Sequence, residues 1–203
     1  MTHAFTGTTP AKLEDFTPEI GNALWEAIMA AGGNARDVEK FTANPALIRY
    51  FIAKVNPQMV DCDEVPSIPS GLTIAEEKHQ IKSRMRGLVN PAEVKFYRDS
   101  RQGQTSYLKG TLLKEALEGQ PVMPAKLLDW YSANPGEIPE SWKGQAVFFW
   151  GTIYSDGYGN LCVRYLGWDG GRWDAYYDYL DAAWDAGSPA LVSASTSSAA
   201  QPG

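Results

Sequence analysis

Aromatic residues are concentrated in one stretch near the C-terminal end of the chain. Thirteen of the 24 aromatic residues (7 Trp, 10 Tyr and 7 Phe) lie between Trp142 and Trp184, mixed with glycine and aspartate. Side chains of this kind at this density suit pleated, half-buried strands. The sequence therefore predicts a β region late in the chain, after a part with different character.

The β region is expected to be a three-stranded antiparallel meander. The apolar runs 146–154 and 161–168 flank a turn that contains Asp156-Gly157, and 169–171 (Asp-Gly-Gly) separates the second run from 172–180. Such dipeptides between alternating apolar runs are typical of hairpin turns. The third strand is the least regular of the three, because its end could also belong to a terminal helix.

Strict alternation along the first strand would place aromatic side chains on both faces of the sheet. It sends Phe148, Trp150 and Tyr154 to one face, and Phe149 and Ile153 to the other. Two interpretations stay open. Either one face is exposed and binds a partner, or the helical region covers that face and all of these side chains are core.

The preceding part of the chain shows helical signals. Ile20, Leu24, Ala27, Ile28 and Ala31 form a stripe of helical spacing that ends at Gly32-Gly33. Further helices are expected at 34–41, 45–55, 73–87, 90–98, 108–117 and from Pro124 through Tyr131. The fold class predicted from these patterns is α+β: an N-terminal helical bundle followed by a small aromatic-rich antiparallel β-meander.

The expected organisation follows from these shifts in composition. It comprises a flexible N-terminus (1–17), a three-helix segment (18–55), a proline-rich linker (56–72), a helical region (73–140), an antiparallel β region (141–186) and a disordered tail (193–203).

Charge is unevenly distributed along the chain. The formal net charge is −6, whereas residues 65–126 carry ten basic and six acidic groups. Any polyanion would meet this middle segment first. The basic patch expected there consists of Lys78, Lys82, Arg84, Arg86, Lys95, Arg98 and Arg101. The competing interpretation is an ordinary solvated face that Glu76, Glu77 and Glu93 partly neutralise.

Several classes of chemistry lack a recognisable motif. The sequence has only two histidines, His3 and His79, and two distant cysteines, Cys62 and Cys162, and it has no glycine-rich phosphate loop and no nucleophile elbow. The aspartates of the β region suit turns better than a glycosidase pair. We therefore expect no catalytic residues, no metal site and no cofactor, and an enzymatic activity is disfavoured though left open.

A helix-turn-helix near 34–55 is also disfavoured, because its third helix offers only Arg49 and Lys54 to bases. No apolar run approaches the roughly 20 residues of a membrane helix, and the first ten residues do not resemble a secretory signal. A cytoplasmic protein with no membrane partner is the expectation.

The motifs Phe148-Phe-Trp-Gly-Thr-Ile-Tyr154 and Trp168-Asp-Gly-Gly-Arg-Trp173 together resemble a C-terminal pattern in uncharacterised hypothetical proteins of uncultivated small-genome bacteria. The resemblance covers about a quarter of the chain. It implies a bacterial cytosolic origin, and it carries no activity, cofactor or site residue.

The function predicted from these features is that of a non-enzymatic binding or adaptor protein that contacts a protein partner through its aromatic C-terminal sheet. The candidate binding residues are Trp150, Tyr154, Tyr165, Trp168, Arg172 and Trp173. The alternative is a nucleic-acid-associated protein that uses the basic region 78–101.

Overall fold

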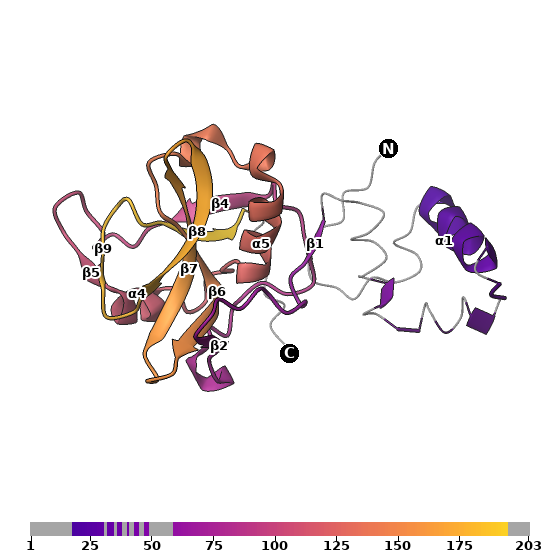
Figure 1. Ribbon diagram of the computed structural model, residues 1–203, viewed down its shortest axis with the longest axis horizontal. Coiled ribbons are helices and arrows are strands. Elements are labelled where there is room, and N and C mark those ends of the chain that lie inside the picture. The colour runs from indigo at the N-terminus through magenta and orange to yellow at the C-terminus, as the bar shows by residue number, and fades with distance from the viewer. Residues whose placement is uncertain are drawn as a thin grey trace, which may run out of the picture.

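The computed structural model describes residues 18–30, 32–34, 36–37, 40, 43–44, 47–48 and 59–194. Its first element, α1 (Pro18–Ala30), is a helix that lies apart from the sheet (Figure 1). This helix occupies the range that the apolar stripe predicts. The other helices expected up to residue 55 lie largely outside the described residues.

A six-stranded sheet forms the centre of residues 59–194. Its order is β4-β10-β6-β7-β8, and β2 pairs with the far end of β6. The strands are β2 (Leu72–Ile74), β4 (Val94–Tyr97), β6 (Val147–Asp156), β7 (Leu161–Asp169), β8 (Arg172–Tyr179) and β10 (Ala190–Ser193). β6, β7 and β8 form the antiparallel meander that the sequence predicts, whereas β10 runs parallel to β6 and antiparallel to β4.

Shorter elements surround the sheet. Two small ladders pair β1 (Val60–Asp61) with β3 (Leu88–Val89), and β5 (Leu108–Lys109) with β9 (Ala183–Trp184). The α-helices are α4 (Gly110–Ala116) and α5 (Ala125–Ala133), and the 3-10 turns are η2 (Glu77–His79), η3 (Pro135–Glu137) and η4 (Glu140–Trp142). Figure 1 shows α5 beside the sheet, where it contacts β6, β7 and β8.

The sheet has a hydrophobic cluster on each face. On one face, Phe148 and Trp150 of β6 pack with residues of α4 and with Trp184 of β9. On the other face, Val147 and Phe149 pack with residues of α5. β6 is consequently buried from Val147 to Tyr154, so this central strand is core on both sides.

A bulge in β6 breaks the alternation expected for this strand. Its register with β7 shifts between Phe148 and Ile153. Ile153 therefore joins the cluster of Phe148 and Trp150, while Tyr154 packs with Ala125 of α5 on the opposite side. The sequence-based assignment of Tyr154 to the face of Trp150 is wrong, because β6 advances five residues from Phe148 to Ile153 while β7 advances two, and this odd offset inverts every later side chain.

The predicted fold class, an N-terminal helical bundle followed by a small β-meander, is wrong, because strands predominate over helices in the described residues. The described residues form ten strands and three short α-helices, so this part of the chain is mostly β-sheet and α+β only in a loose sense. Helices expected at 73–87 and 90–98 are replaced by β2, η2, β3 and β4. The helices expected at 108–117 and from Pro124 are present as α4 and α5.

The region 73–87 forms no α-helix, only the 3-10 turn η2, because its polar groups find partners in the sheet. Thr73 and Ile74 pair with the end of β6. The buried carboxamide of Gln80 donates to the carbonyls of Ala75 and Ile153 and accepts from the Ile153 amide, each at 2.9 Å. These bonds satisfy the Ala75 carbonyl, which a helix would satisfy internally, and both backbone groups of Ile153, so they tie this segment to β6.

The signal at Asn90-Pro91 begins a turn, not a helix. The Asn90 side chain accepts a hydrogen bond from the Ala92 amide at 3.0 Å, and the Glu93 amide donates to the Asn90 carbonyl at 3.0 Å. The same side-chain geometry serves helix caps and Asx turns. The strand β4 that follows then pairs with β10, which reaches Ser193, and residues 195–203 of the predicted tail lie outside the described residues.

Candidate functional site

Strand β8 forms one edge of the central sheet. All eight of its residues pair with β7, from Arg172 opposite Asp169 to Tyr179 opposite Cys162. Within residues 59–194, no strand pairs with its outer side. In an antiparallel edge strand, alternate residues direct their backbone N–H and C=O groups away from the sheet. β8 thus offers a row of hydrogen-bonding groups to a further extended segment.

Aromatic side chains flank this edge on both faces. Tyr177 lies across from Arg164 on the face covered by α5, and it is 41% exposed. Tyr176 lies across from Tyr165 on the opposite face, is 37% exposed, and has its ring centroid 5.4 Å from that of Tyr165. A segment lying along β8 would therefore meet a tyrosine on either side.

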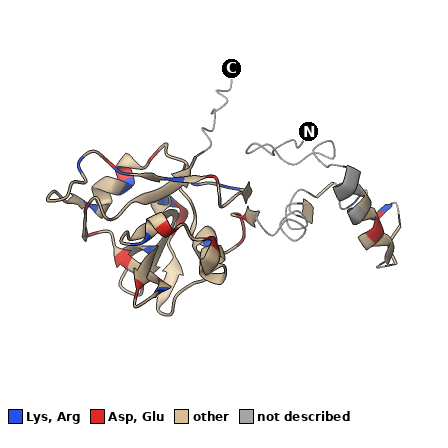
Figure 2. Ribbon diagram, turned by 90° about the horizontal axis from the view of Figure 1, so that it is seen from above, with Lys and Arg blue, Asp and Glu red and all other residues tan. Residues whose placement is uncertain are grey.

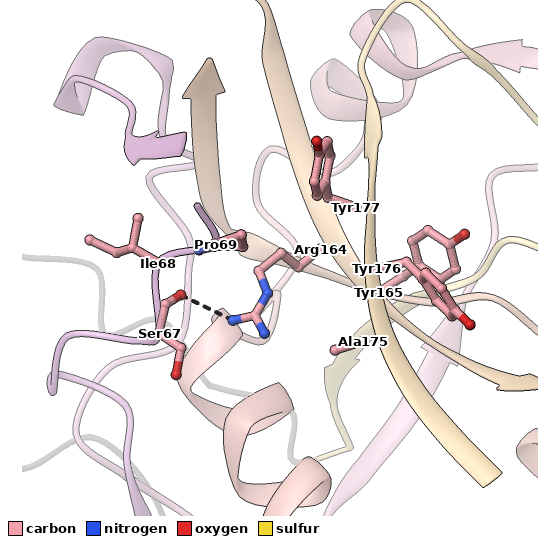
Figure 3. A pocket seen from close by; sticks show the side chains of 8 residues that line it. All are labelled: Ser67, Ile68, Pro69, Arg164, Tyr165, Ala175, Tyr176 and Tyr177. Carbon is pink, nitrogen blue, oxygen red and sulfur yellow. Dashed lines mark hydrogen bonds between the residues drawn. The ribbon is translucent and has the colours of Figure 1, made fainter. Parts of the chain in front are cut away.

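A groove of about 440 Å³ lies beside β8 on the α5 face (Figure 3). The segment before β2 forms one wall with Ser67, Ile68 and Pro69, and Ala175 and Tyr177 of β8 form the other; Tyr165 and Tyr176, whose side chains lie on the opposite face, also border the groove. Ile68 is 49% exposed. The groove thus has apolar walls that are accessible from solvent.

Arg164 lies in this groove with its guanidinium directed at Ser67 (Figure 3). Its Nη1 donates to the Asp129 carboxylate at 2.8 Å and to the Ser67 carbonyl at 3.1 Å. The Ser67 amide donates to the other Asp129 oxygen at 2.6 Å. This arrangement ties the Ser67 segment to α5 and β7, and it compensates the charge of Arg164 within the protein.

Tyr154 of β6 also belongs to this hydrogen-bond network. Its hydroxyl donates to the Ser67 carbonyl at 3.1 Å. Burial raises the pKa of this phenol to about 12, even though the nearby Arg164 opposes the rise. Tyr154 therefore stays protonated and serves as a hydrogen-bond donor that supports the groove wall.

The structure separates the six sequence-predicted binding residues into two groups. Trp150 and Tyr154 are fully buried in the core, so neither can touch a partner. The others lie at least partly at the surface: Tyr165, Trp168, Arg172 and Trp173. Tyr165 lies on the opposite face of the sheet from the two tryptophans, since its cross-strand partner is Tyr176 while Trp168 pairs with Trp173.

Three of these residues come together at the β7–β8 turn. Trp168 and Trp173 meet edge to face with ring centroids 5.4 Å apart, and the Lys143 ammonium lies 3.9 Å from the Trp168 ring centroid. Arg172 donates to the Asp174 carboxylate at 2.8 Å. Tyr176, Tyr177 and the groove wall at Ser67–Pro69 are not among the sequence-predicted binding residues. The two adjacent tyrosines are visible in the sequence, but they can contact a partner only because β8 lies at the edge of the sheet.

The residues of the basic patch do not share one helical face, because no helix forms there. Most of them are bound to nearby carboxylates or carbonyls. The pairs are Lys78–Glu76 (2.9 Å), Arg84–Glu77 (3.1 Å), Arg86–Asp63 (3.9 Å) and Arg101–Asp99 (2.7 Å). Arg98 donates to the Ala186 carbonyl at 2.7 Å and to Gln145 at 2.9 Å. Within the described residues, only Lys82 and Lys95 of the patch form no such contact.

Positions of both charge signs are interspersed over the sheet region (Figure 2). Asp99 illustrates the local compensation, since hydrogen bonds from Arg101 lower the pKa of its carboxyl group. Paired surface charges of this kind give little net attraction for a polyanion. The arrangement therefore favours the interpretation of the patch as an ordinary solvated surface.

Both cysteine thiols are buried and form no disulfide. Burial, followed by the charges of Asp61 and Asp63, raises the pKa of Cys62 far above its ordinary range. Burial raises the pKa of Cys162 to about 11. Thiols in these surroundings are protonated at neutral pH and are poor nucleophiles.

Cys62 lines a smaller cleft of about 160 Å³ together with Glu77, Arg84 and Arg86. Within the described part of the chain, no three His, Cys, Asp or Glu side chains converge as metal ligands would. None of the helices in that part has the length and apolarity needed to cross a bilayer.

Comparison of the chain with protein-family models, with curated proteins and with solved structures finds no match. The resemblance of the aromatic motifs to bacterial proteins therefore stays a prediction.

Proposed function

We propose that this protein is a non-enzymatic binding protein that holds a polypeptide partner along the outer edge of β8. The observation that carries the proposal is the eight-residue strand with an open edge and an exposed tyrosine on each face. Extended segments join such edges through backbone hydrogen bonds, and flanking side chains select them.

The groove beside β8 supports the same proposal. A strand added to β8 would direct alternate side chains toward Ala175, Tyr177 and the exposed Ile68. Apolar contacts there would add to the backbone bonds, because each exposed apolar surface would leave water on binding. The network of Arg164, Asp129 and Ser67 keeps the opposite wall in place before a partner arrives, which lowers the entropy lost on binding.

The test compares partner capture by the full chain and by surface variants. We would purify the tagged protein at low salt from a bacterial lysate, with and without nuclease, and record native mass spectra. The double variant Tyr176→Ala, Tyr177→Ala is expected to recover at least tenfold less of any protein partner than the wild type. Tyr158→Ala is the matched control, because Tyr158 is 94% exposed in the β6–β7 turn and lies outside both β8 and the groove.

Circular dichroism and thermal melts establish that all three proteins are folded. Equal capture by the double variant and the wild type would show that the β8 edge is not the binding surface. A nucleic-acid mass that disappears with nuclease would favour the alternative function instead. A bare monomer in every preparation would argue against both macromolecular functions.

A further inference from the structure

The two faces of β8 present side chains of different chemistry. The face covered by α5 carries Trp173, Ala175, Tyr177 and Tyr179, which are apolar or aromatic. The opposite face carries Arg172, Asp174, Tyr176 and Asp178. Alternation along the strand thus produces one apolar row and one charged row.

The charged row has an excess of negative charge. Arg172 is already paired with Asp174 at 2.8 Å. Asp169, opposite Arg172 in β7, adds a further carboxylate on the same face, and Asp181 follows the end of β8. Among the described residues, no cation lies within ion-pair distance of Asp169, Asp178 or Asp181. These carboxylates remain available to positive charges from outside.

Neighbouring tyrosines respond to this negative field. Burial and then the charges of Asp174 and Asp169 raise the pKa of Tyr176. Burial and then Asp178 raise the pKa of Tyr165, whose ring stacks against that of Tyr176. The tyrosine faces are additionally suited to contact Lys or Arg side chains.

We propose that the partner of β8 is an extended segment in which Lys or Arg residues alternate with apolar, preferably β-branched, residues. This inference rests on the proposed function and specifies the class of partner. When such a segment adds to β8, its cations lie opposite Asp174, Tyr176 and Asp178, and its apolar residues lie beside Ala175 and Tyr177. Directly opposed charges of opposite sign, and aromatic residues opposite β-branched ones, are the favourable cross-strand pairs.

A second copy of this chain is a poorer occupant of the same edge. Each β8 row and its surroundings carry the same net negative charge, since Asp169, Asp174, Asp178 and Asp181 outnumber Arg172, so a second copy brings none of the net positive charge that a basic segment supplies. A segment with acidic residues would be repelled for the same reason. Charge complementarity therefore selects a basic, alternating partner.

The test measures binding of five synthetic peptides, of four designs, to the full chain. Each has eight central residues between glycines: alternating Lys and Val, the same composition in two blocks, alternating Glu and Val, and alternating Lys and Val with backbone N-methyl groups. The methylated peptide is made in two forms, with methyl groups on odd or on even residues. Binding is followed by fluorescence anisotropy, and hydrogen exchange of the β8 amides locates the site.

The alternating Lys/Val peptide is expected to bind at least tenfold more tightly than the block and Glu/Val peptides, and to slow exchange of β8 amides. One of the two methylated forms should lose binding, because it cannot donate to the β8 carbonyls. Asp178→Asn should weaken binding roughly two- to fivefold. Glu137→Gln, which removes one charge from the exposed η3 turn, should leave the affinity unchanged.

Equal affinity for the Lys/Val and Glu/Val peptides would overturn this inference, and so would protection of amides elsewhere than β8. Formation of a β8-linked dimer that excludes the peptide would overturn it as well. The peptide test can fail while the Tyr176, Tyr177 double variant captures less of a natural partner than the wild type does. In that event the proposed function stands and only the class of partner is wrong. If the Tyr176, Tyr177 double variant still binds both the natural partner and the peptide, the proposed function itself is contradicted.

Discussion

Gly151 of β6 packs tightly against the segment that leads into α5. Its amide donates to the Met123 carbonyl at 2.9 Å. A Cβ at this position would lie 2.7 Å from the Pro124 nitrogen and 2.8 Å from the Met123 carbonyl carbon. Both are backbone atoms, so the contact could be relieved only by moving the chain.

We expect Gly151→Ala to lower the free energy of unfolding by about 3 kcal/mol, because overpacking forces a backbone shift in a fully buried region. Urea denaturation followed by tryptophan fluorescence measures the change. Gly157→Ala is the control, since no atom lies within 4 Å of a Cβ built there. Similar stability losses in both variants would contradict this explanation.

Tyr154 provides a residue-scale prediction about pH. Its phenol is buried, donates to the Ser67 carbonyl, and has a pKa raised to about 12, whereas an unfolded tyrosine has a pKa near 10. The stability that comes from keeping this phenol neutral is fully present below about pH 10. It is lost as the pH rises toward 12, because the unfolded chain releases its proton first.

Tyr154→Phe should therefore be less stable than the wild type by about 1 kcal/mol at pH 7, owing to the lost hydrogen bond. The difference should shrink and then reverse above pH 10, by a total change on the order of 2 to 3 kcal/mol. Urea unfolding at pH 7 and at several values between 9 and 11.5 measures it. Tyr158→Phe, at an exposed position, serves as the comparison. A constant difference at all pH values would be inconsistent with a shifted phenol.

At the scale of elements, the Arg164–Asp129 pair joins β7 to α5 and to the segment before β2. The Arg164 side chain is 9% exposed and that of Asp129 is 18% exposed. Removing one partner of a buried pair leaves the other charge without compensation. This contact therefore differs from the exposed Arg172–Asp174 pair, which has a comparable distance of 2.8 Å.

We expect Asp129→Ala to cost about 3 kcal/mol of stability, and the double change Asp129→Leu, Arg164→Met to cost clearly less. Asp174→Ala in the exposed pair should cost less than about 1 kcal/mol. Denaturant unfolding of the single and double variants gives the coupling. If the double change were as costly as the sum of its single changes, the pair would not act as a unit.

Elements that depend on neighbouring residues in the chain could be predicted from the sequence. The three long strands, α4 and α5 follow from alternation, helical spacing and the glycine or proline residues at their ends. Residues 73–87 could not be predicted in this way. Their capping-box pattern is compatible with a helix, and only the buried partners of Gln80 in β6 decide against it.

At the scale of the whole molecule, the two buried cysteines report on the integrity of the core. Cys62 follows β1 and Cys162 lies in β7. With a pKa of about 11, Cys162 holds about one part in a thousand of its thiol as thiolate at pH 8. Burial limits access to both thiols in addition.

Alkylation of the native protein at pH 8 should consequently be at least 100-fold slower than in urea for both thiols. Mass spectrometry of the labelled chain over time follows each site. Rapid labelling of one cysteine in the native protein would show that the part of the sheet around it opens locally. A uniform slow rate that rises with denaturant would show that the core opens as one unit.

The candidate site requires contacts between distant parts of the molecule, whereas each long strand can be predicted from its own residues. The sequence by itself determines that residues 147–179 form a twisted meander, because its turns at Asp156-Gly157 and Asp169-Gly170 bring nearby residues together at little entropic cost. It also determines the alternation of Asp and Tyr in β8. Tertiary structure alone decides which aromatic side chains are exposed to solvent.

Pairing of β10 with both β4 and β6, between segments far apart in the chain, makes β6 a central strand and buries Trp150. The register shift between Phe148 and Ile153 sends Tyr154 to the α5 side. With β10 and β4 extending one side of the meander, β8 is left as the edge on the other. Such long-range contacts depend on the energy of the complete core, which local patterns of residues do not contain.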